Sequence, residues 1–160
     1  MVELLITTSR KPGIKTRAFA RDLAKSFPNS VYFSRGKSSL GNLFDHAVFE
    51  GKKTVLIIGE KHGNPVEVQA VKLKENEFSY ALKAFIKVMK LRKELGNERR
   101  KFSSLKLVEV KEKTKKFLNE INAEFNKNSD NKLIESDYAV SFYLNEKEIG
   151  PRFKIEKLIE

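Results

Sequence analysis

The stretch "LLITTSRKPGIKTRAFARDLAKSFPNS" (Leu4–Ser30) decides how the fold begins. Its apolar start predicts a buried strand over residues 3–7, and the Pro12-Gly13 pair breaks that strand. A helical pattern follows, from Thr16, which suits the N-cap, to the residue before Pro28. The stretch therefore predicts a strand followed by a helix.

Two stripes of side chains repeat every four residues along this helix: Phe19, Leu23 and Phe27, and Arg17, Arg21 and Lys25. The apolar stripe predicts the face that packs on the core. The cationic stripe lies about 200° around the helix and faces solvent. Its neighbouring charges repel each other by about 0.2–0.5 kcal/mol per pair, and Arg17 also opposes the helix dipole. An ordinary solvated face could carry such charges, but a polyanion partner would neutralise them, so we favour a binding surface.

The chain continues with alternating strands and helices. A short strand is predicted at Val31–Phe33, and a helix runs from Ser38 or Ser39 to Phe49. The strand Thr54–Ile58, "TVLII", is apolar on both faces, as in a parallel sheet that helices cover on both sides. The first sixty residues therefore predict a β-α-β-α-β unit of an α/β fold.

After this unit the pattern is less regular. "GEKHGNP" (59–65) is predicted to be a loop, and residues 66–71 are predicted to be a strand. Residues 78–89 fit both a strand and a helix, and we favour the strand because apolar side chains alternate there. The polar stretch "RKELGNERRK" (92–101) is the best candidate for a boundary between two halves.

The pattern of the second half predicts another small α/β unit, similar in size to the first. A strand, a helix and two further strands are expected at residues 105–110, 114–125, 138–144 and 153–159. The chain is then a single domain, 1–160, with pseudo-repeat halves at 1–95 and 100–160.

The composition narrows the class of protein. Charged residues make up 33% and hydrophobic residues 40% of the 160 residues, and no apolar run approaches the roughly 20 residues of a membrane helix. The lack of cysteine excludes disulfides and thiolate metal sites, and with no visible signal peptide it fits a cytoplasmic protein. The net charge is +11, and residues 1–100 carry 20 Lys and Arg against 10 Asp and Glu. Such a basic surface favours a polyanion, most often nucleic acid.

No motif predicts catalysis, a metal site or a cofactor. "RGKSS" (Arg35–Ser39) is not a nucleotide-binding loop, because Val31 stands where that motif needs a second glycine. Gly36 still allows a phosphate to approach the backbone closely, next to the start of a helix. His46 and His62 have no second metal ligand at regular spacing. We therefore expect a binding protein rather than an enzyme.

Four segments form an ordered set of motifs. They are "TTSRKPGIKTRAFARDLAKSFPNS" (7–30), "SRGKSSLGNL" (34–43), "VLIIGEKHGNP" (55–65) and "EIGPRFKI" (148–155). In order they resemble the T-S-R-x-P start, the F-x-x-D-L-x-x-x-F-P-N helix, the R-G segment, the strand with E-x-x-G-x-P, and the G-P-R-F close of the Brix domain family. The set covers nearly the whole chain, and the short chain looks like the minimal archaeal form of that family.

The resemblance implies a ribosome biogenesis factor that binds precursor ribosomal RNA and assists its processing or subunit assembly. It also implies two similar α/β halves, each like the anticodon-binding domain of class IIa aminoacyl-tRNA synthetases. Other ribosome assembly or ribosomal proteins are further expected partners, and a membrane is not. The likeness to anticodon-binding domains leaves one alternative open, a tRNA-binding accessory module.

The expected RNA-binding residues lie in three segments. The first follows the initial strand and continues along the cationic helix stripe, and the second surrounds the R-G pair. The third is the arginine of G-P-R-F, which is either a surface charge or folds back toward the first basic site. The residues are Ser9, Arg10, Lys11, Arg17, Arg21, Lys25, Arg35, Gly36, Lys37 and Arg152. Few aromatic residues are placed to stack on bases, so we expect recognition of RNA shape and backbone.

Overall fold

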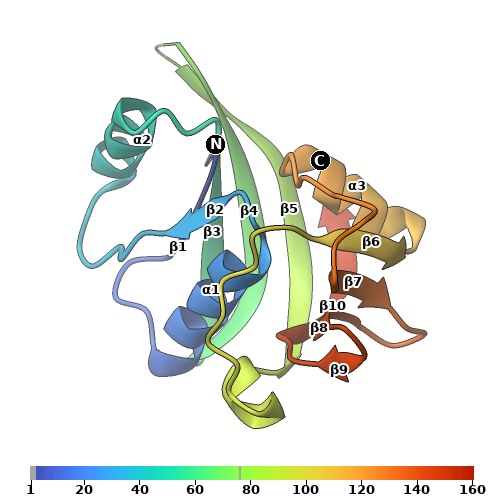
Figure 1. Cartoon of the computed structure of the whole chain (residues 1–160). Coiled ribbons are helices and arrows are strands. Elements are labelled where there is room, and N and C mark those ends of the chain that lie inside the picture. Colours follow the sequence, from blue (N-terminus) through green and yellow to red (C-terminus); the bar gives the residue numbers. More distant parts are fainter. Residues whose placement is uncertain (1–2, 76) are drawn as a thin grey trace.

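One mixed β-sheet runs through the whole molecule (Figure 1). The structure is a computed structural model, and it describes residues 3–75 and 77–160. The helices are α1 (Ile14–Ser26), α2 (Leu40–Phe49), α3 (Glu112–Glu120) and a short 3-10 helix, η1 (Arg92–Leu95). The strands are β1 (Leu4–Thr8), β2 (Ser30–Tyr32), β3 (Thr54–Lys61), β4 (Asn64–Lys74), β5 (Glu77–Lys90), β6 (Lys106–Glu109), β7 (Asn131–Glu135), β8 (Val140–Leu144), β9 (Lys147–Glu148) and β10 (Arg152–Ile159). Their order is β2-β1-β3-β4-β5-β10-β8-β7-β6, and β9 pairs with β8.

The first three strands are parallel, because α1 and α2 form the crossover connections between them. Along β1, Leu4 and Ile6 pack in the core that α1 covers, whereas Leu5 packs in a second core under α2. β3 alternates between the same two cores. The prediction of a strand at 54–58 that is buried on both faces is therefore confirmed.

The predicted loop at residues 59–65 is wrong. β3 continues to Lys61 and β4 begins at Asn64, so only His62 and Gly63 form the turn. Both have positive φ, 53° for His62 and 78° for Gly63. A two-residue turn of this kind matches the twist of an antiparallel hairpin, and the polar residues on either side stay in the ladder.

The ambiguous segment 78–89 lies in a strand, as favoured from the sequence. β5 pairs with β4 on one side and with β10 on the other, both antiparallel. The predicted helix at 114–125 is shorter than expected, because α3 ends at Glu120 and Asn122 has a φ of 56°.

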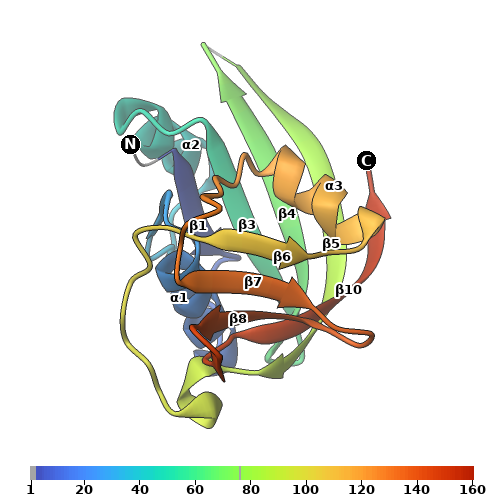
Figure 2. The ribbon, with the colours of Figure 1, turned by 45° about the vertical axis from the view of Figure 1, so that its right-hand side comes forward.

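The same series of pairings occurs twice in the sheet. β1-β3-β4-β5 is parallel, antiparallel and antiparallel, and β6-β7-β8-β10 repeats this series. The sheet curls around α1 (Figure 2). Phe19 of α1 packs edge-on against Phe153 of β10, with ring centroids 5.6 Å apart. Within the described residues the fold is mixed α/β, with one large sheet and three α-helices. The resemblance of each half to an anticodon-binding domain is not confirmed.

Candidate nucleic-acid interface

Two loops meet where β1 and β2 end. The Lys11 N–H donates to the Gly36 carbonyl oxygen at 3.2 Å, and Arg35 Nη1 donates to the Thr8 carbonyl oxygen at 3.0 Å. The segments Ser9–Gly13 and Arg35–Ser38 therefore lie side by side, although they are far apart in the sequence. Binding sites tend to form at such strand ends in open α/β sheets.

Arg35 lies inside this junction. Its residue is only 4% exposed, and its Nε donates to the Ser38 carbonyl oxygen at 2.7 Å. Burial, and then the positive charge of Arg10, lower the pKa of Arg35. Arg35 thus holds the two loops in place, while Arg10 and Lys37 are exposed beside it.

The N-terminus of α1 is capped by the carboxylate of Glu60, a residue of β3. Glu60 Oε2 accepts hydrogen bonds from the Gly13 N–H at 3.0 Å and from the Thr16 hydroxyl at 2.5 Å. The prediction of Thr16 as N-cap is wrong, because the helix begins at Ile14 and Gly13 is the N-cap residue. A negative charge at this end offsets the unfavourable position of Arg17 in the first turn.

The two stripes of α1 lie as the sequence predicts. Phe19, Leu23 and Phe27 are each 2% exposed or less. Arg17 and Arg21 are exposed and Lys25 is half-buried. The Arg21 guanidinium lies 5.2 Å from the ring centroid of Tyr32. No ion pair involves any of these three cations, or Arg10, Lys11 and Lys37, within residues 3–75 and 77–160.

The C-terminus of α1 is held by Arg92, which the sequence analysis did not single out. Arg92 is 1% exposed, and its Nη2 donates to Ser26 Oγ at 3.0 Å. The same guanidinium donates to the carbonyl oxygens of Arg100, Glu98 and Gly150 at 2.8, 3.2 and 3.2 Å. Burial lowers the pKa of Arg92. A cation inside a polar stretch such as 92–101 gives no sign in the sequence that it is buried.

Lys101 completes this end of the helix. Its Nζ donates to the carbonyl oxygens of Ala24 and Phe27 at 2.6 and 2.7 Å. Desolvation of the ammonium, and then the charge of Arg92, lower the pKa of Lys101 to about 8. A cation at a helix C-terminus interacts favourably with the dipole, so both ends of α1 carry a charge of the right sign.

Arg152 does not join the α1 stripe. Its neighbour Phe153 packs against α1, and successive strand residues point to opposite faces, so Arg152 lies on the other face of the sheet. There its Nε and Nη2 donate to the two carboxylate oxygens of Glu148, at 2.7 and 2.5 Å. The hydrogen bond from Arg152 lowers the pKa of Glu148. Of the two alternatives for Arg152, the fold back toward the first basic site does not occur.

A different exposed surface is apolar. A groove of about 570 Å³ lies between α2 and the end of the β4–β5 hairpin, and Phe44, Phe49 and Phe78 are among its lining residues. Phe49 is 87% exposed. Its lining carries one cation, Lys74, together with the carboxylates Asp45 and Glu77, so the groove does not suit a phosphate backbone.

The described part of the chain offers no metal centre and no membrane helix. Within residues 3–75 and 77–160, no three His, Cys, Asp or Glu side chains are grouped so as to hold a metal ion. In the same ranges no helix has the length and apolar character needed to cross a membrane.

Comparison with known sequences gives archaeal relatives. No protein-family model matches the chain. A probable Brix domain-containing ribosomal biogenesis protein from Thermococcus kodakarensis is 38% identical over 93 residues, which cover 58% of this chain and 45% of that protein. A protein with the same description from Pyrococcus abyssi is 37% identical over 58% of this chain and 42% of its own length. The matches thus span less than half the length of these relatives.

Comparison with solved structures extends the similarity to almost the whole chain. The crystal structure of a probable ribosomal biogenesis protein from Aeropyrum pernix matches with a TM-score of 0.77 and 22% identity, over 98% of this chain and 97% of that one. The crystal structure of Mil, an archaeal Imp4-like protein, matches with a TM-score of 0.72 and 21% identity, over 98% and 99%. At this identity the two structures show the shared fold. The sequence matches confirm the resemblance: over 93 residues the chain is similar to Brix domain-containing ribosomal biogenesis proteins of archaea.

Proposed function

We propose that this chain acts in ribosome biogenesis by binding precursor ribosomal RNA. The names of its relatives support the biological process. The observation that supports RNA binding is a set of cations, at one end and along one side of α1, that form no ion pair within residues 3–75 and 77–160. We call these cations, together with Ser9 and Gly36, the α1 surface. Its members are Ser9, Arg10, Lys11, Arg17, Arg21, Lys25, Gly36 and Lys37.

The cations of the α1 surface bind phosphates in this proposal. Phosphate contacts fix the position of a protein on RNA and release counterions, and they need no base-specific geometry. Ser9 and the backbone near Gly36 donate further hydrogen bonds. Gly36 suits this role because it is exposed, and a β-carbon built at its position would meet no atom within 4 Å.

Arg35 acts as a positioning residue in the proposal. Its donors are directed at the carbonyl oxygens of Thr8 and Ser38, so it shapes the loops that present Arg10 and Lys37. The N-terminus of α1 takes no phosphate, because Glu60 already occupies it.

The role we propose is non-enzymatic. The chain holds precursor RNA in a defined arrangement and so assists its processing or its assembly into a subunit. Other assembly proteins or ribosomal proteins act beside it.

Salt dependence of RNA affinity tests the proposal. We expect Arg17→Ala/Arg21→Ala to weaken binding to a precursor ribosomal RNA fragment and to reduce the slope of log K against log salt by about 1.4–1.8, because two phosphate contacts are lost. Filter binding or fluorescence anisotropy between about 50 and 200 mM salt measures both.

The matched control is Lys115→Ala/Lys127→Ala, which removes the same charge from exposed positions of the second half. It should leave the slope close to that of the wild type. If the α1 double variant keeps the affinity and the slope of the wild type, the α1 surface does not bind the RNA.

A further inference from the structure

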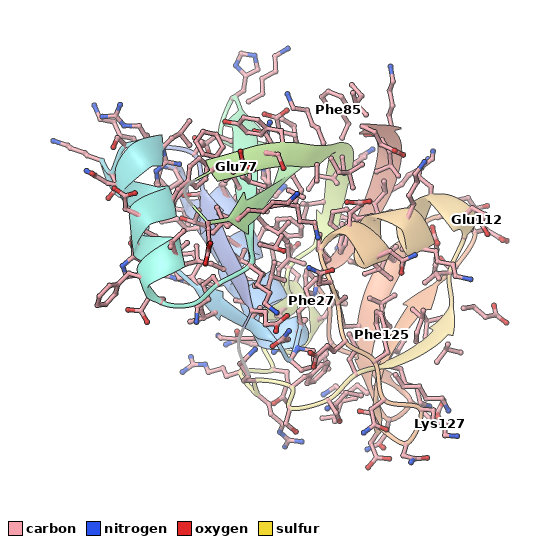
Figure 3. All side chains as sticks on the ribbon, turned by 90° about the horizontal axis from the view of Figure 1, so that it is seen from above. Phe27, Glu77, Phe85, Glu112, Phe125 and Lys127 are labelled. Carbon is pink, nitrogen blue, oxygen red and sulfur yellow. The ribbon has the colours of Figure 1, made fainter. Side chains whose placement is uncertain are left out.

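A second cationic surface lies on the face of the sheet that is turned away from α1 and α3. Along β5, Leu82, Ala84 and Ile86 are buried in the core that contains α1, so the residues between them point to the other side. In β10, Phe153 and Ile155 point to the core in the same way. We call the opposite side of these two strands the outer sheet face; it comprises Lys83, Phe85, Lys87, Met89, Arg152, Lys154 and Lys157. In Figure 3, Phe85 lies on the far side of the β5 ribbon from Phe27.

Like charges are placed directly opposite each other on this face. Lys154 of β10 is the register partner of Lys87 of β5, and Lys157 is the partner of Phe85. Cross-strand pairs of equal charge destabilise a sheet, so folding does not favour this arrangement. Within the described ranges Lys87, Lys154 and Lys157 form no ion pair, and all three are exposed.

A polar cavity of about 330 Å³ opens at one end of the same face. Tyr138, Tyr143, Glu148 and Arg152 line it together with Met89 and Ser141. Its volume falls in the range of about 300–1,000 Å³ that is typical of small-molecule sites. Tyr138 is 75% exposed, whereas Ser141 is 3% exposed. Hydrogen bonding to Arg152 lowers the pKa of Glu148, so its carboxylate stays an acceptor at neutral pH.

We propose that the outer sheet face is a second RNA-binding surface, which takes a single-stranded segment. Lys87, Lys154 and Lys157 contact its phosphates. One unstacked base enters the cavity, where Tyr138 or Tyr143 stacks on it and the Glu148–Arg152 pair offers an acceptor and donors to its edge. This inference rests on the proposed function, since it concerns the same class of ligand.

The cavity chemistry favours single-stranded RNA over a duplex. Bases in a helix are stacked and cannot enter a cavity, whereas single-stranded segments present faces for aromatic stacking and edges for hydrogen bonds. Because the α1 surface lies on the opposite side of the sheet, the chain then contacts two RNA segments at once.

Binding of two short RNAs tests this inference. The probes are an unstructured 12-nucleotide single strand and a fully paired, blunt-ended RNA duplex, each measured at about 0.15 M salt. We expect Lys87→Ala/Lys154→Ala and, separately, Tyr138→Ala to weaken single-strand binding about fivefold or more, with little change for the duplex. Lys115→Ala/Lys127→Ala is the charge control, and equal thermal unfolding midpoints show that the variants are folded.

The outcomes separate the inference from the proposed function. If outer-face variants bind the single strand as the wild type does, while Arg17→Ala/Arg21→Ala weakens RNA binding, the inference is wrong and the proposed function stands. If the wild type binds neither RNA, both are wrong. Ultraviolet crosslinking of the bound single strand to a peptide that contains Tyr138 supports the inference independently.

Discussion

At the scale of single residues, Arg92 makes contacts in three parts of the chain. It links Ser26 at the end of α1, Gly150 before β10, and the connection between the two halves. Its guanidinium also lies 5.1 Å from the ring centroid of Phe102. Removing the Arg92 side chain should destabilise the fold, because the buried carbonyl oxygens that accept its hydrogen bonds would be left without donors.

Replacement of Arg92 tests this role. We expect Arg92→Ala to lower the free energy of unfolding by about 3–5 kcal/mol, since it leaves both a cavity and unsatisfied acceptors. Urea denaturation measures the loss, and Arg99→Ala, which removes an exposed arginine from the same segment, should cost less than about 0.5 kcal/mol. A loss below about 1 kcal/mol for Arg92→Ala would mean that the hydrogen bonds of the Arg92 guanidinium contribute little to stability.

At this scale the sequence predicts which side chains face outward, but it does not predict which groups they bind. The spacing of Arg17 and Arg21 already shows an outward stripe, because helical periodicity depends only on neighbours in the sequence. Arg35 and Arg152 look the same in the sequence, yet one is buried against carbonyl oxygens and the other pairs with Glu148. Those partners come from the tertiary fold, which single-residue patterns do not contain.

At the scale of elements, α1 depends on groups outside its own sequence. Glu60 closes its N-terminus and Lys101 closes its C-terminus. Local signals pointed to Thr16 as the cap because capping residues are normally close in sequence. The acceptor for the N–H of the N-cap residue Gly13 instead comes from Glu60, 47 residues away, so no local signal marks the start of the helix.

Removal of the Glu60 carboxylate tests how much this cap contributes. We expect Glu60→Ala to lower the free energy of unfolding by about 1–2 kcal/mol, because the Gly13 N–H and the Thr16 hydroxyl lose their acceptor. Glu60→Gln keeps an amide oxygen in place and should cost less. Chemical denaturation compares both with Glu124→Ala, an exposed control. Equal stability of all three variants would show that the cap has no effect.

At the scale of the whole molecule, one sheet joins both parts of the chain. We propose that residues 1–160 form a single domain, in which segments 1–95 and 100–160 are pseudo-repeat halves. The repeated series of strand pairings supports the halves, and one buried core that contains residues from both supports the single domain. The β-α-β-α-β start was predictable because strands and helices there have clear periods, whereas the pairing of β5 with β10 depends on contacts across the whole chain.

A single domain of this kind should unfold as one unit. We expect amide NMR signals from β3 and from β7 to disappear at the same urea concentration, because the core that packs on both strands is shared. Two separate midpoints would mean that the halves are independent domains.

The most direct test of the account is the RNA that the protein holds in cells. Crosslinking in the native organism, followed by sequencing of the bound RNA and mapping of the crosslinked peptides, gives both partners of the contact. We predict precursor ribosomal RNA, crosslinked to peptides from residues 9–25 and 35–37. Mature tRNA as the main bound RNA, or crosslinks that leave these segments free, would contradict the central claim.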